Sequence, residues 1–373
     1  MDFFRSTRLS NNMKIAHITL LHGYNFGGLL QAYATQKILK SFGYDVVTLD
    51  YHPSRRILLI RKLTLNFSDF HKKIRIWIDS YQFSNVKQFE EFRSKYFQFS
   101  ASCYNSFQLS RECQTVDAVV VGSDQVWSSK WLRPPYFLDF ALKSKCKRLA
   151  LSACCGQASD DEEYLNYCKR SFAKFDAISV RNTFTADLVK KTIGLAAEVI
   201  CDPTLATELP TEPVSGITGP YILVYIINRR FSLSLAENIL HLCKLRLAIA
   251  AYSIPPSELK GVEILAVDRV ISNISPFQWS YLVTNASHVI TDSFHGTIFS
   301  IKNHRSLTVI DSGFKSASRL RNFLTDLELE HLLVSSAEDY DKSFALDIDW
   351  ARVDKKIERM KSGYHQFVTK HLS

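Results

Sequence analysis

The sequence has little that would place it in a membrane, outside the cell or in a repeat array. Among its 373 residues, whose mean hydropathy is −0.07, no apolar run approaches the roughly 20 residues that a spanning helix needs. Residues 1–12 are polar and contain no apolar core, so we expect no secretory signal, and Met13 is an alternative start. No short repeat or low-complexity segment is visible. These features predict a globular protein, and the length favours two domains.

The cysteines do not have the spacing of a metal or redox site. None of the eight belongs to a C-x-x-C pair, and several lie in apolar, strand-like runs, where a reduced cysteine acts as a small hydrophobe. Free thiols are typical of the cytoplasm, so we expect a cytoplasmic protein. No other cluster with the spacing of metal ligands is apparent. The sequence therefore predicts no metal and no cofactor.

Basic residues exceed acidic ones, which favours an anionic partner. The formal net charge is +9. Much of the excess lies between Tyr51 and Ser80, where the acidic residues are Asp69 and Asp79 and the basic ones are Arg55, Arg56, Arg61, Lys62, Lys72, Lys73 and Arg75. These bases alternate with apolar residues, which leaves two interpretations of the segment 52–78. It either lies on the anionic inner face of the cell membrane or forms a solvated helical face over the core. We expect no nucleic acid partner, since no recognisable binding module is present.

Hydrophobic periodicity predicts two series of alternating strands and helices. In the first, a strand at 14–21, a helix that ends near Gly43 and a strand at 45–50 form a βαβ unit, and further strands follow at 118–121, 148–152, 177–180 and 198–201. A Pro- and Gly-rich linker at 209–220 precedes strands at 221–227, 247–251, 263–266, 289–291 and 307–310. We therefore predict an N-terminal extension at 1–12, Rossmann-like α/β domains at 13–210 and 211–345, and a helix at 346–373 that packs back. In such an architecture the active site lies in the crevice between the domains.

The most informative motif is Thr-Asp-Ser-Phe-His-Gly at 291–296, because it places a histidine where a buried strand turns into a helix. Ser293 is a good N-cap, and Gly296 opens the apolar helix that follows His295. Unpaired N–H groups at such a helix start favour an anion. His295 is therefore either a catalytic group or a capping or core residue.

Two further strand-to-helix turns carry polar or flexible residues. The turn that contains Asn25, Gly27 and Gly28 lets the backbone approach a ligand or simply packs tightly, and it matches neither G-x-G-x-x-G nor a P-loop. After the strand at 118–121 come Ser123, Asp124, Gln125 and Trp127. This cluster suits a sugar, with Trp127 as a stacking face, or it is a helix N-cap with a core tryptophan.

Three charged residues also follow strands. Arg181 is a bidentate partner for a carboxylate or phosphate, or forms a surface ion pair. Asp202 either orients Arg181 or caps the next helix, and Lys315 lies on the loop after the strand at 307–310, where it reaches the crevice of His295 or is solvated.

Taken together, these motifs resemble those of the polysaccharide pyruvyl transferase family. The matching segments occur in the family's order and cover most of the chain from about residue 13 to residue 311. They are Asn-Phe-Gly-Gly at 25–28, Leu-Gln-Ala-Tyr at 30–33, Val-Gly-Ser-Asp-Gln-Val-Trp at 121–127, Ile-Ser-Val-Arg at 178–181, Asp-Pro-Thr at 202–204, Ser-Pro-Phe at 275–277 and the motif at 291–296.

The resemblance implies a GT-B-like fold and an enzyme that transfers pyruvate from phosphoenolpyruvate to a sugar of a cell-surface polysaccharide, as a ketal. We expect the acceptor on the N-terminal domain and the donor on the C-terminal domain, and the basic stretch from Arg55 to Arg75 leads us to expect a lipid-linked acceptor. Arg181 and His295 match the family's arginine and histidine in donor binding and catalysis, and Lys315 matches a lysine that some members carry. Some members have arginine near the position of Ser293, so this chain departs there.

The chemistry agrees with this resemblance. Phosphoenolpyruvate is doubly anionic, which suits Arg181, Lys315 and a helix start, and His295, with an unperturbed pKa of about 6.5, suits proton exchange near neutrality. The alternatives are a GT-B glycosyltransferase that uses a sugar nucleotide and a non-catalytic glycan-binding homologue.

Overall fold

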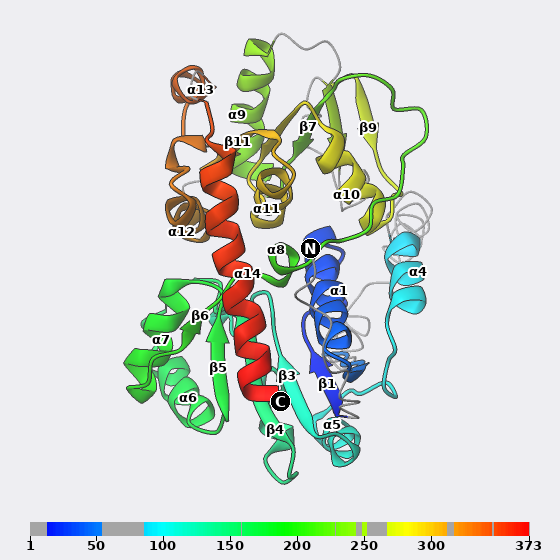
Figure 1. Ribbon diagram of the computed structural model, residues 1–373, viewed down its shortest axis with the longest axis vertical. Helices are drawn as coiled ribbons and strands as arrows, with labels where there is room; N and C mark the ends of the chain where they lie inside the picture. The colour runs from blue at the N-terminus through cyan, green and yellow to red at the C-terminus, as the bar shows by residue number, and fades with distance from the viewer. Residues whose placement is uncertain are drawn as a thin grey trace, which may run out of the picture.

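Two parallel β-sheets, one in each half of the chain, organise the protein (Figure 1). The computed structural model describes residues 13–53, 86–157, 159–227, 229–243, 248–251, 267–311, 317–344 and 347–372. Each sheet has six strands, in the orders β2-β1-β3-β4-β5-β6 and β12-β11-β10-β7-β8-β9. All the pairings are parallel, so helices must connect the strands. The prediction of two Rossmann-like α/β domains is confirmed.

The N-terminal half contains the first sheet and its helices. Its strands are β1 (Lys14–Ile18), β2 (Asp45–Thr48), β3 (Ala118–Val121), β4 (Lys147–Ala153), β5 (Ala177–Val180) and β6 (Glu198–Val199). Its helices are α1 (Phe26–Ser41), α4 (Val86–Tyr96), α5 (Ser106–Glu112), α6 (Glu162–Phe172), α7 (Thr183–Ile193) and the single turn α8 (Pro203–Ala206). The central strand β3 reads Ala-Val-Val-Val and is buried at every position, as expected for a strand covered on both faces.

The C-terminal half repeats the plan. Its strands are β7 (Ile222–Tyr225), β8 (Ala248–Ala251), β9 (Arg269–Ile271), β10 (His288–Thr291), β11 (Ser306–Ile310) and β12 (Leu333–Val334). Its helices are α9 (Arg229–Leu242), α10 (Pro276–Asn285), α11 (Phe294–Lys302), α12 (Ala317–Leu327) and α13 (Ala337–Phe344). The last helix, α14 (Trp350–Leu372), runs across both halves, as the red helix of Figure 1 shows.

Some elements differ from the sequence prediction. The strand expected at 263–266 lies outside the described residues, and the strand that pairs with β8 is β9, at Arg269–Ile271. The two-residue strand β12 and the helices α5, α12 and α13 were not predicted. Strands as short as β9 and β12 are too short to show an alternation of apolar and polar residues. They are therefore recognised by their hydrogen bonds to the neighbouring strand rather than by the local sequence.

Both sheets reverse their strand order at a point that bears on function. In the first sheet the order reverses between β1 and β3, and in the second it reverses between β7 and β10. Open α/β sheets bind ligands at such switch points, beyond the carboxyl ends of the strands. The segments that follow β1, β3 and β10 are therefore placed to form a site.

One apolar cluster spans both halves of the protein. Phe26 of α1 stacks on Trp279 of α10 with ring centroids 5.6 Å apart, and both side chains are completely buried. The same apolar cluster includes Tyr364, Phe367 and Val368 of α14. A continuous core across the boundary brings the carboxyl ends of the two sheets to face each other.

Candidate active site

An ion pair between Arg181 and Asp202 forms the centre of the candidate site. Arg181 directly follows β5, and Asp202 is the N-cap of α8. Both side chains are completely buried, and Nη1 of Arg181 lies 2.8 Å from Oδ2 of Asp202. Nη2 of the same guanidinium donates to Oδ1 of Asp124, at 3.1 Å. Burial opposes the charge on Arg181, but Cys154, Asp124 and Asp202 outweigh it and raise the pKa of Arg181, so the cation is permanent.

Asp202 is held by hydrogen bonds on both carboxylate oxygens. Thr204 donates to Oδ1 from its backbone N–H, at 3.0 Å, and from its hydroxyl, at 2.7 Å. Ser123 donates its hydroxyl to Oδ2 at 3.1 Å. Burial alone would raise the pKa of Asp202, but His295, Arg181 and Thr204 outweigh it, and the pKa lies well below its usual range. The buried carboxylate is therefore ionised at neutral pH.

His295 reaches this ion pair from the other half of the molecule. It lies in the first turn of α11, whose N-cap Ser293 accepts a hydrogen bond from the N–H of Gly296. Nε2 of His295 lies 3.5 Å from Oδ2 of Asp202, within ion-pair range but beyond a good hydrogen bond. This nitrogen is buried and has no hydrogen-bond partner in the described part of the chain. It is therefore available to exchange a proton with a bound ligand.

The start of α1 packs against the histidine. Asn25 caps α1 by accepting a hydrogen bond from the N–H of Gly28, at 3.0 Å. A Cβ atom on Gly27 would lie 2.2 Å from Nδ1 of His295, and one on Gly28 would lie 3.6 Å from Oδ2 of Asp124. Gly27 thus lets the imidazole pack directly against the start of α1.

The turn after β3 places Ser123 and Asp124 beside Arg181. Gly122 has φ +128°, and a Cβ atom there would meet the carbonyl oxygen of Leu151 at 2.1 Å, so only glycine fits. Asp124 itself has φ 61°, in the left-handed region that aspartate tolerates better than most residues. Gln31 of α1 accepts a hydrogen bond from the N–H of Ser123 at 2.9 Å. Local backbone geometry therefore aims the Asp124 carboxylate at the guanidinium.

Trp127 does not have the place that a sugar-stacking residue needs. Its side chain is completely buried, and its indole N–H donates to the carbonyl oxygen of Tyr136 at 2.9 Å. The rings of Phe137, Phe172 and Phe175 surround it. Trp127 therefore packs the core, which was the other interpretation of this motif. Gln125 is half-buried, and its amide approaches Gly156.

Arg319 is a second buried arginine in the neighbourhood of Arg181, and the sequence did not reveal it. It comes from α12, and its Nε is buried without a hydrogen-bond partner among the described residues. Burial lowers the pKa of Arg319. The charges of Cys154 and Asp124 oppose this shift, whereas the positive charge of Arg181 adds to it. Two buried guanidinium groups therefore act on each other across the domain boundary. No strand-end motif marks Arg319, and a basic residue in an amphipathic helix gives no sequence signal.

A cavity of about 270 Å³ adjoins the ion pair. Arg181 and Asp202 line it together with Phe294, Phe323, Asp326 and Arg359. The ring of Phe294 packs against the ion pair, with the guanidinium carbon of Arg181 4.6 Å from its centroid. The cavity thus reaches the charged centre from the side of α12 and α14.

Two of the predicted features lie outside the described residues. Lys315 is one of them. The other is the basic segment 52–78, of which the structure describes His52 and Pro53.

Residues 25–313 match the family model named polysaccharide pyruvyl transferase. The chain belongs to this family. The match covers the first glycine turn, both residues of the central ion pair and His295. No curated protein matches the chain.

Solved structures with the same fold are distant in sequence. The UDP-GlcNAc 2-epimerase of Methanocaldococcus jannaschii has a TM-score of 0.56 at 12% identity, with 97% of this chain and 100% of that chain covered. UGT89C1 of Arabidopsis thaliana has a TM-score of 0.53 at 12% identity, with 96% and 99% covered. A mutant O-GlcNAc transferase of Thermobaculum terrenum, with a TM-score of 0.44 at 10% identity, aligns over 96% of this chain, which spans 64% of that protein's length. Together with the two parallel sheets, the first two similarities confirm the GT-B-like fold.

Proposed function

We propose that this family member transfers pyruvate from phosphoenolpyruvate to two hydroxyls of a sugar, forming a ketal and releasing phosphate. The observation that carries the proposal is the convergence of His295 on the buried Arg181–Asp202 pair, with Nε2 free of a hydrogen-bond partner among the described residues. A free proton-exchanging group beside fixed cations suits an anionic substrate whose reaction begins with protonation.

Two guanidinium groups and a helix start provide the donor site. Arg181 is already paired with Asp124 and Asp202, so it holds the site together and contributes a permanent positive charge. Nε of Arg319 has no hydrogen-bond partner in the described part of the chain, and we assign Arg319 to the carboxylate or phosphate of the donor. The first turn of α11 adds its partial positive charge next to His295. Lys315, which precedes α12 in the sequence, is the third cation that we propose.

The proposed reaction is balanced without a metal or a redox partner. His295 protonates the methylene carbon of phosphoenolpyruvate, which becomes the methyl group and leaves an oxocarbenium-like centre at the adjacent carbon. One sugar hydroxyl attacks that carbon and gives its proton back to the imidazole. The C–O bond to phosphate then breaks, phosphate leaves with the proton of the second hydroxyl, and that hydroxyl oxygen closes the ketal. Asp202 stabilises the imidazolium form of His295 in each step.

The acceptor side belongs to the first sheet in this proposal. Ser123, Asp124 and Gln125 follow β3, and Asn25, Gly27 and Gly28 form the N-cap and first turn of α1, so all of them belong to the N-terminal half, where Gly27 packs against His295. Two carboxylates, Asp124 and Asp202, pair with Arg181. Asp124 is the one that is partly exposed, which suits a hydroxyl of the acceptor as its partner. Ser293 and Gly296 shape the start of α11 around the donor.

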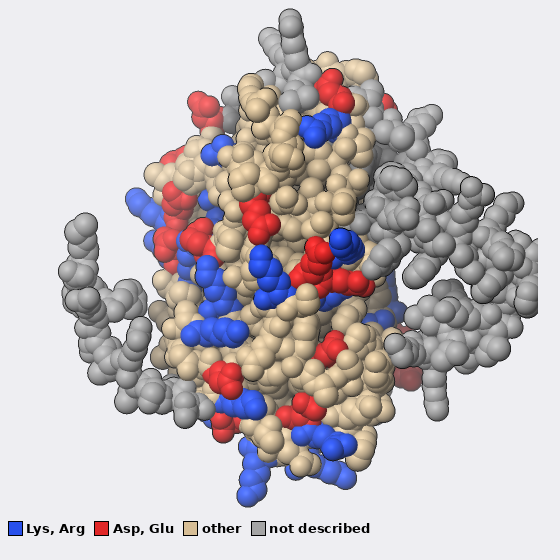
Figure 2. Space-filling view, turned by 90° about the vertical axis from the view of Figure 1, so that its right-hand side faces the viewer, with Lys and Arg blue, Asp and Glu red and all other residues tan. Residues whose placement is uncertain are grey.

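We further propose a lipid-linked acceptor, reached by peripheral contact of the segment 52–78 with the cytoplasmic face of the membrane. No helix in the described ranges is long and apolar enough to cross a bilayer. On the face shown in Figure 2, the described basic side chains lie among acidic ones and form no separate basic patch. The proposed membrane contact is therefore supported by the excess of basic residues between Tyr51 and Ser80. Absence of binding to anionic liposomes at low salt would overturn it.

The deciding experiment compares two donors. The purified protein is incubated with a lipid-linked glycan from its own source and either phosphoenolpyruvate or a sugar nucleotide, and release of phosphate is compared with release of nucleotide. We expect phosphate release and a glycan mass increase equal to one ketal-linked pyruvate, both abolished by His295→Ala. Nucleotide release would instead indicate a glycosyltransferase, and turnover that survives His295→Ala would overturn the mechanism.

A binding protein without turnover gives a different result. It would release neither product, and His295→Ala and Arg181→Ala would leave glycan binding nearly unchanged. Mass spectrometry of surface glycan from cells with and without the protein tests the same proposal in vivo.

A further inference from the structure

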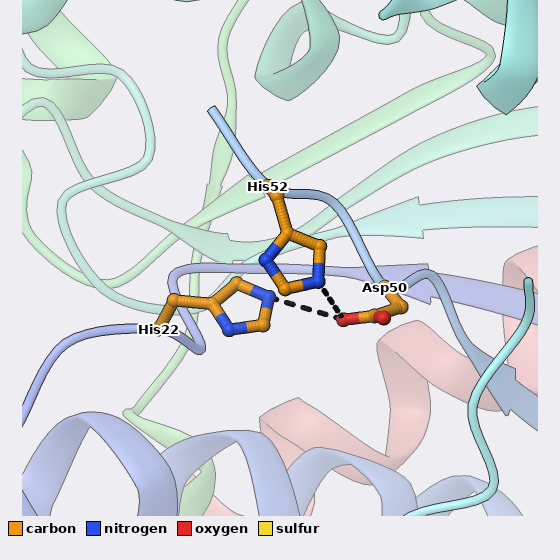
Figure 3. A group of neighbouring side chains, drawn as sticks. All are labelled: His22, Asp50 and His52. Carbon is orange, nitrogen blue, oxygen red and sulfur yellow. Dashed lines mark ion pairs between the residues drawn. The ribbon is translucent and has the colours of Figure 1, made fainter. Parts of the chain in front are cut away.

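His22, Asp50 and His52 form a cluster outside the candidate active site. His22 lies in the loop after β1, and Asp50 and His52 follow β2. Because β1 and β2 are parallel neighbours, the two loops meet at one edge of the sheet. Nε2 of His22 lies 3.1 Å from Oδ1 of Asp50, and Nε2 of His52 lies 2.9 Å from the same oxygen. Figure 3 shows both imidazoles turned towards this carboxylate.

The cluster is separate from the Arg181 centre. In the sheet order, β1, β3 and β4 lie between β2 and β5, which precedes Arg181. Four steps between adjacent strands at about 4.8 Å each give a separation of roughly 19 Å. A ligand of this cluster therefore does not occupy the donor site.

The three groups are those that bind a transition metal. The ligand atoms, two imidazole nitrogens and one carboxylate oxygen, all lie within 4.8 Å of one another. Two histidines and one carboxylate occupy one face of an octahedron and leave other positions open. Neighbouring ligands with bonds of about 2.1 Å are then about 3.0 Å apart. The two N–O separations, 3.1 and 2.9 Å, match this spacing.

Nε2 of His22 supplies an independent indication. It is buried and has no hydrogen-bond partner among the described residues, so its contact with Asp50 has the distance but not the geometry of a hydrogen bond. A buried nitrogen without a hydrogen-bond partner is destabilising. A metal ion between the nitrogen and the carboxylate satisfies it.

Neighbouring side chains hold the three groups in place. Ser102 donates its hydroxyl to Oδ2 of Asp50 at 2.6 Å, which leaves Oδ1 to the histidines. The rings of His22 and His52 stack at 4.0 Å, and the ring of Tyr104 stacks on His52 at 5.4 Å. Such outer-shell support orients the ligands of metal sites.

We propose that His22, Asp50 and His52 bind one divalent transition-metal ion, such as Zn²⁺ or Co²⁺, with open coordination positions. The ion ties the loop that leads to the α1 N-cap to the loop after β2. Mg²⁺ and Ca²⁺ do not suit the site, because both prefer an all-oxygen shell.

The test uses the full chain, reduced and stripped with a chelator. Calorimetric titration with Zn²⁺ and visible absorption on addition of Co²⁺ should each show one equivalent, without a thiolate-to-cobalt charge-transfer band. His22→Ala and His52→Ala should each lower the affinity at least about 100-fold, and Ser102→Ala about 10- to 100-fold. Circular dichroism and thermal melting without metal establish that each variant is folded.

His304 provides the matched control. It is a partly exposed histidine that pairs with a single carboxylate, Asp354, at 2.8 Å. His304→Ala should bind one equivalent with unchanged affinity, and Zn²⁺ should raise the melting temperature of wild type and His304→Ala but not of His52→Ala. Lack of saturable binding by wild type, or binding by His22→Ala and His52→Ala with the affinity of wild type, would mean that the three residues form a hydrogen-bonded link only.

Discussion

Gly27 leaves the space in which His295 sits, although the two residues belong to different halves of the protein. A Cβ atom at Gly27 would lie 2.2 Å from Nδ1 and 2.3 Å from Cγ of the imidazole. These are ring and backbone atoms that cannot move independently, so the contact sets the ring position against the start of α1. The glycine turn and the histidine motif are thus two parts of one site.

Gly27→Ala should therefore reduce activity through displacement of His295. A shift of about 1 Å in a catalytic group can lower the rate about 100-fold, and we expect a loss of this size in kcat/KM for phosphate release. Gly23→Ala is the control, since a Cβ atom there meets nothing within 4 Å. Equal activity of the two variants would show that the position of His295 is not limiting.

Arg319→Ala should weaken donor binding more than turnover. Loss of a charge-assisted hydrogen bond of about 1.5–3 kcal/mol raises the KM for phosphoenolpyruvate roughly 10- to 100-fold, with the KM for the acceptor unchanged. Arg321→Ala is the matched control, because Arg321 lies on the same helix but is exposed and pairs with Asp311. An unchanged donor KM in Arg319→Ala would remove Arg319 from the donor site.

Arg181→Ala should destabilise the fold as well as abolish activity. The substitution leaves Asp202 buried without its cation, and loss of one partner of a buried pair costs about 3–5 kcal/mol. Arg148→Ala, which removes a more exposed ion pair with Asp176 at 3.9 Å, should change the free energy of unfolding by about 1 kcal/mol or less. Urea unfolding followed by circular dichroism measures both. Similar values for the two variants would contradict the structural role of Arg181.

Stability should fall as the pH is lowered from about 6.5 to about 4. Burial lowers the pKa of His17 to about 4, although its hydrogen bond to the carbonyl oxygen of Gly122 opposes the shift. The unfolded chain, with a histidine pKa of about 6.5, therefore binds the proton first, and acid favours unfolding by about 3 kcal/mol over this range. His17→Gln should flatten the curve of unfolding free energy against pH, whereas His304→Gln should not. An identical pH dependence of wild type and His17→Gln would show that this proton is not responsible.

The sequence predicted the parts of the site that follow strands. Arg181, Asp202 and Ser123 lie at the carboxyl ends of parallel strands, and such ends meet at one edge of a sheet, so their proximity follows from topology. The pairing itself could not be read, because it depends on side-chain directions. Arg319 lies in a helix and reaches the site only through tertiary packing.

Two other features, the burial of Trp127 and the cluster of His22, Asp50 and His52, also depend on contacts between distant segments. Trp127 has the polar neighbours of a binding residue, but three aromatic rings from later segments enclose it, and no local pattern contains them. His22 and the pair Asp50 and His52 are separated by a whole helix and strand, so no ligand spacing connects them along the chain. Spacing rules identify metal sites only when the ligands share a segment.

Helix α14 acts as a strut between the two halves of the protein. Its 23 residues span about 34 Å as a rigid rod. Lys356 near one end pairs with Glu328, and Lys370 at the other end pairs with Glu198 of β6. Because Tyr364, Phe367 and Val368 also pack into the apolar cluster that spans both halves, the helix fixes the spacing between the two sheets. The spacing that α14 fixes between the sheets is therefore also the spacing across which His295 reaches Asp202.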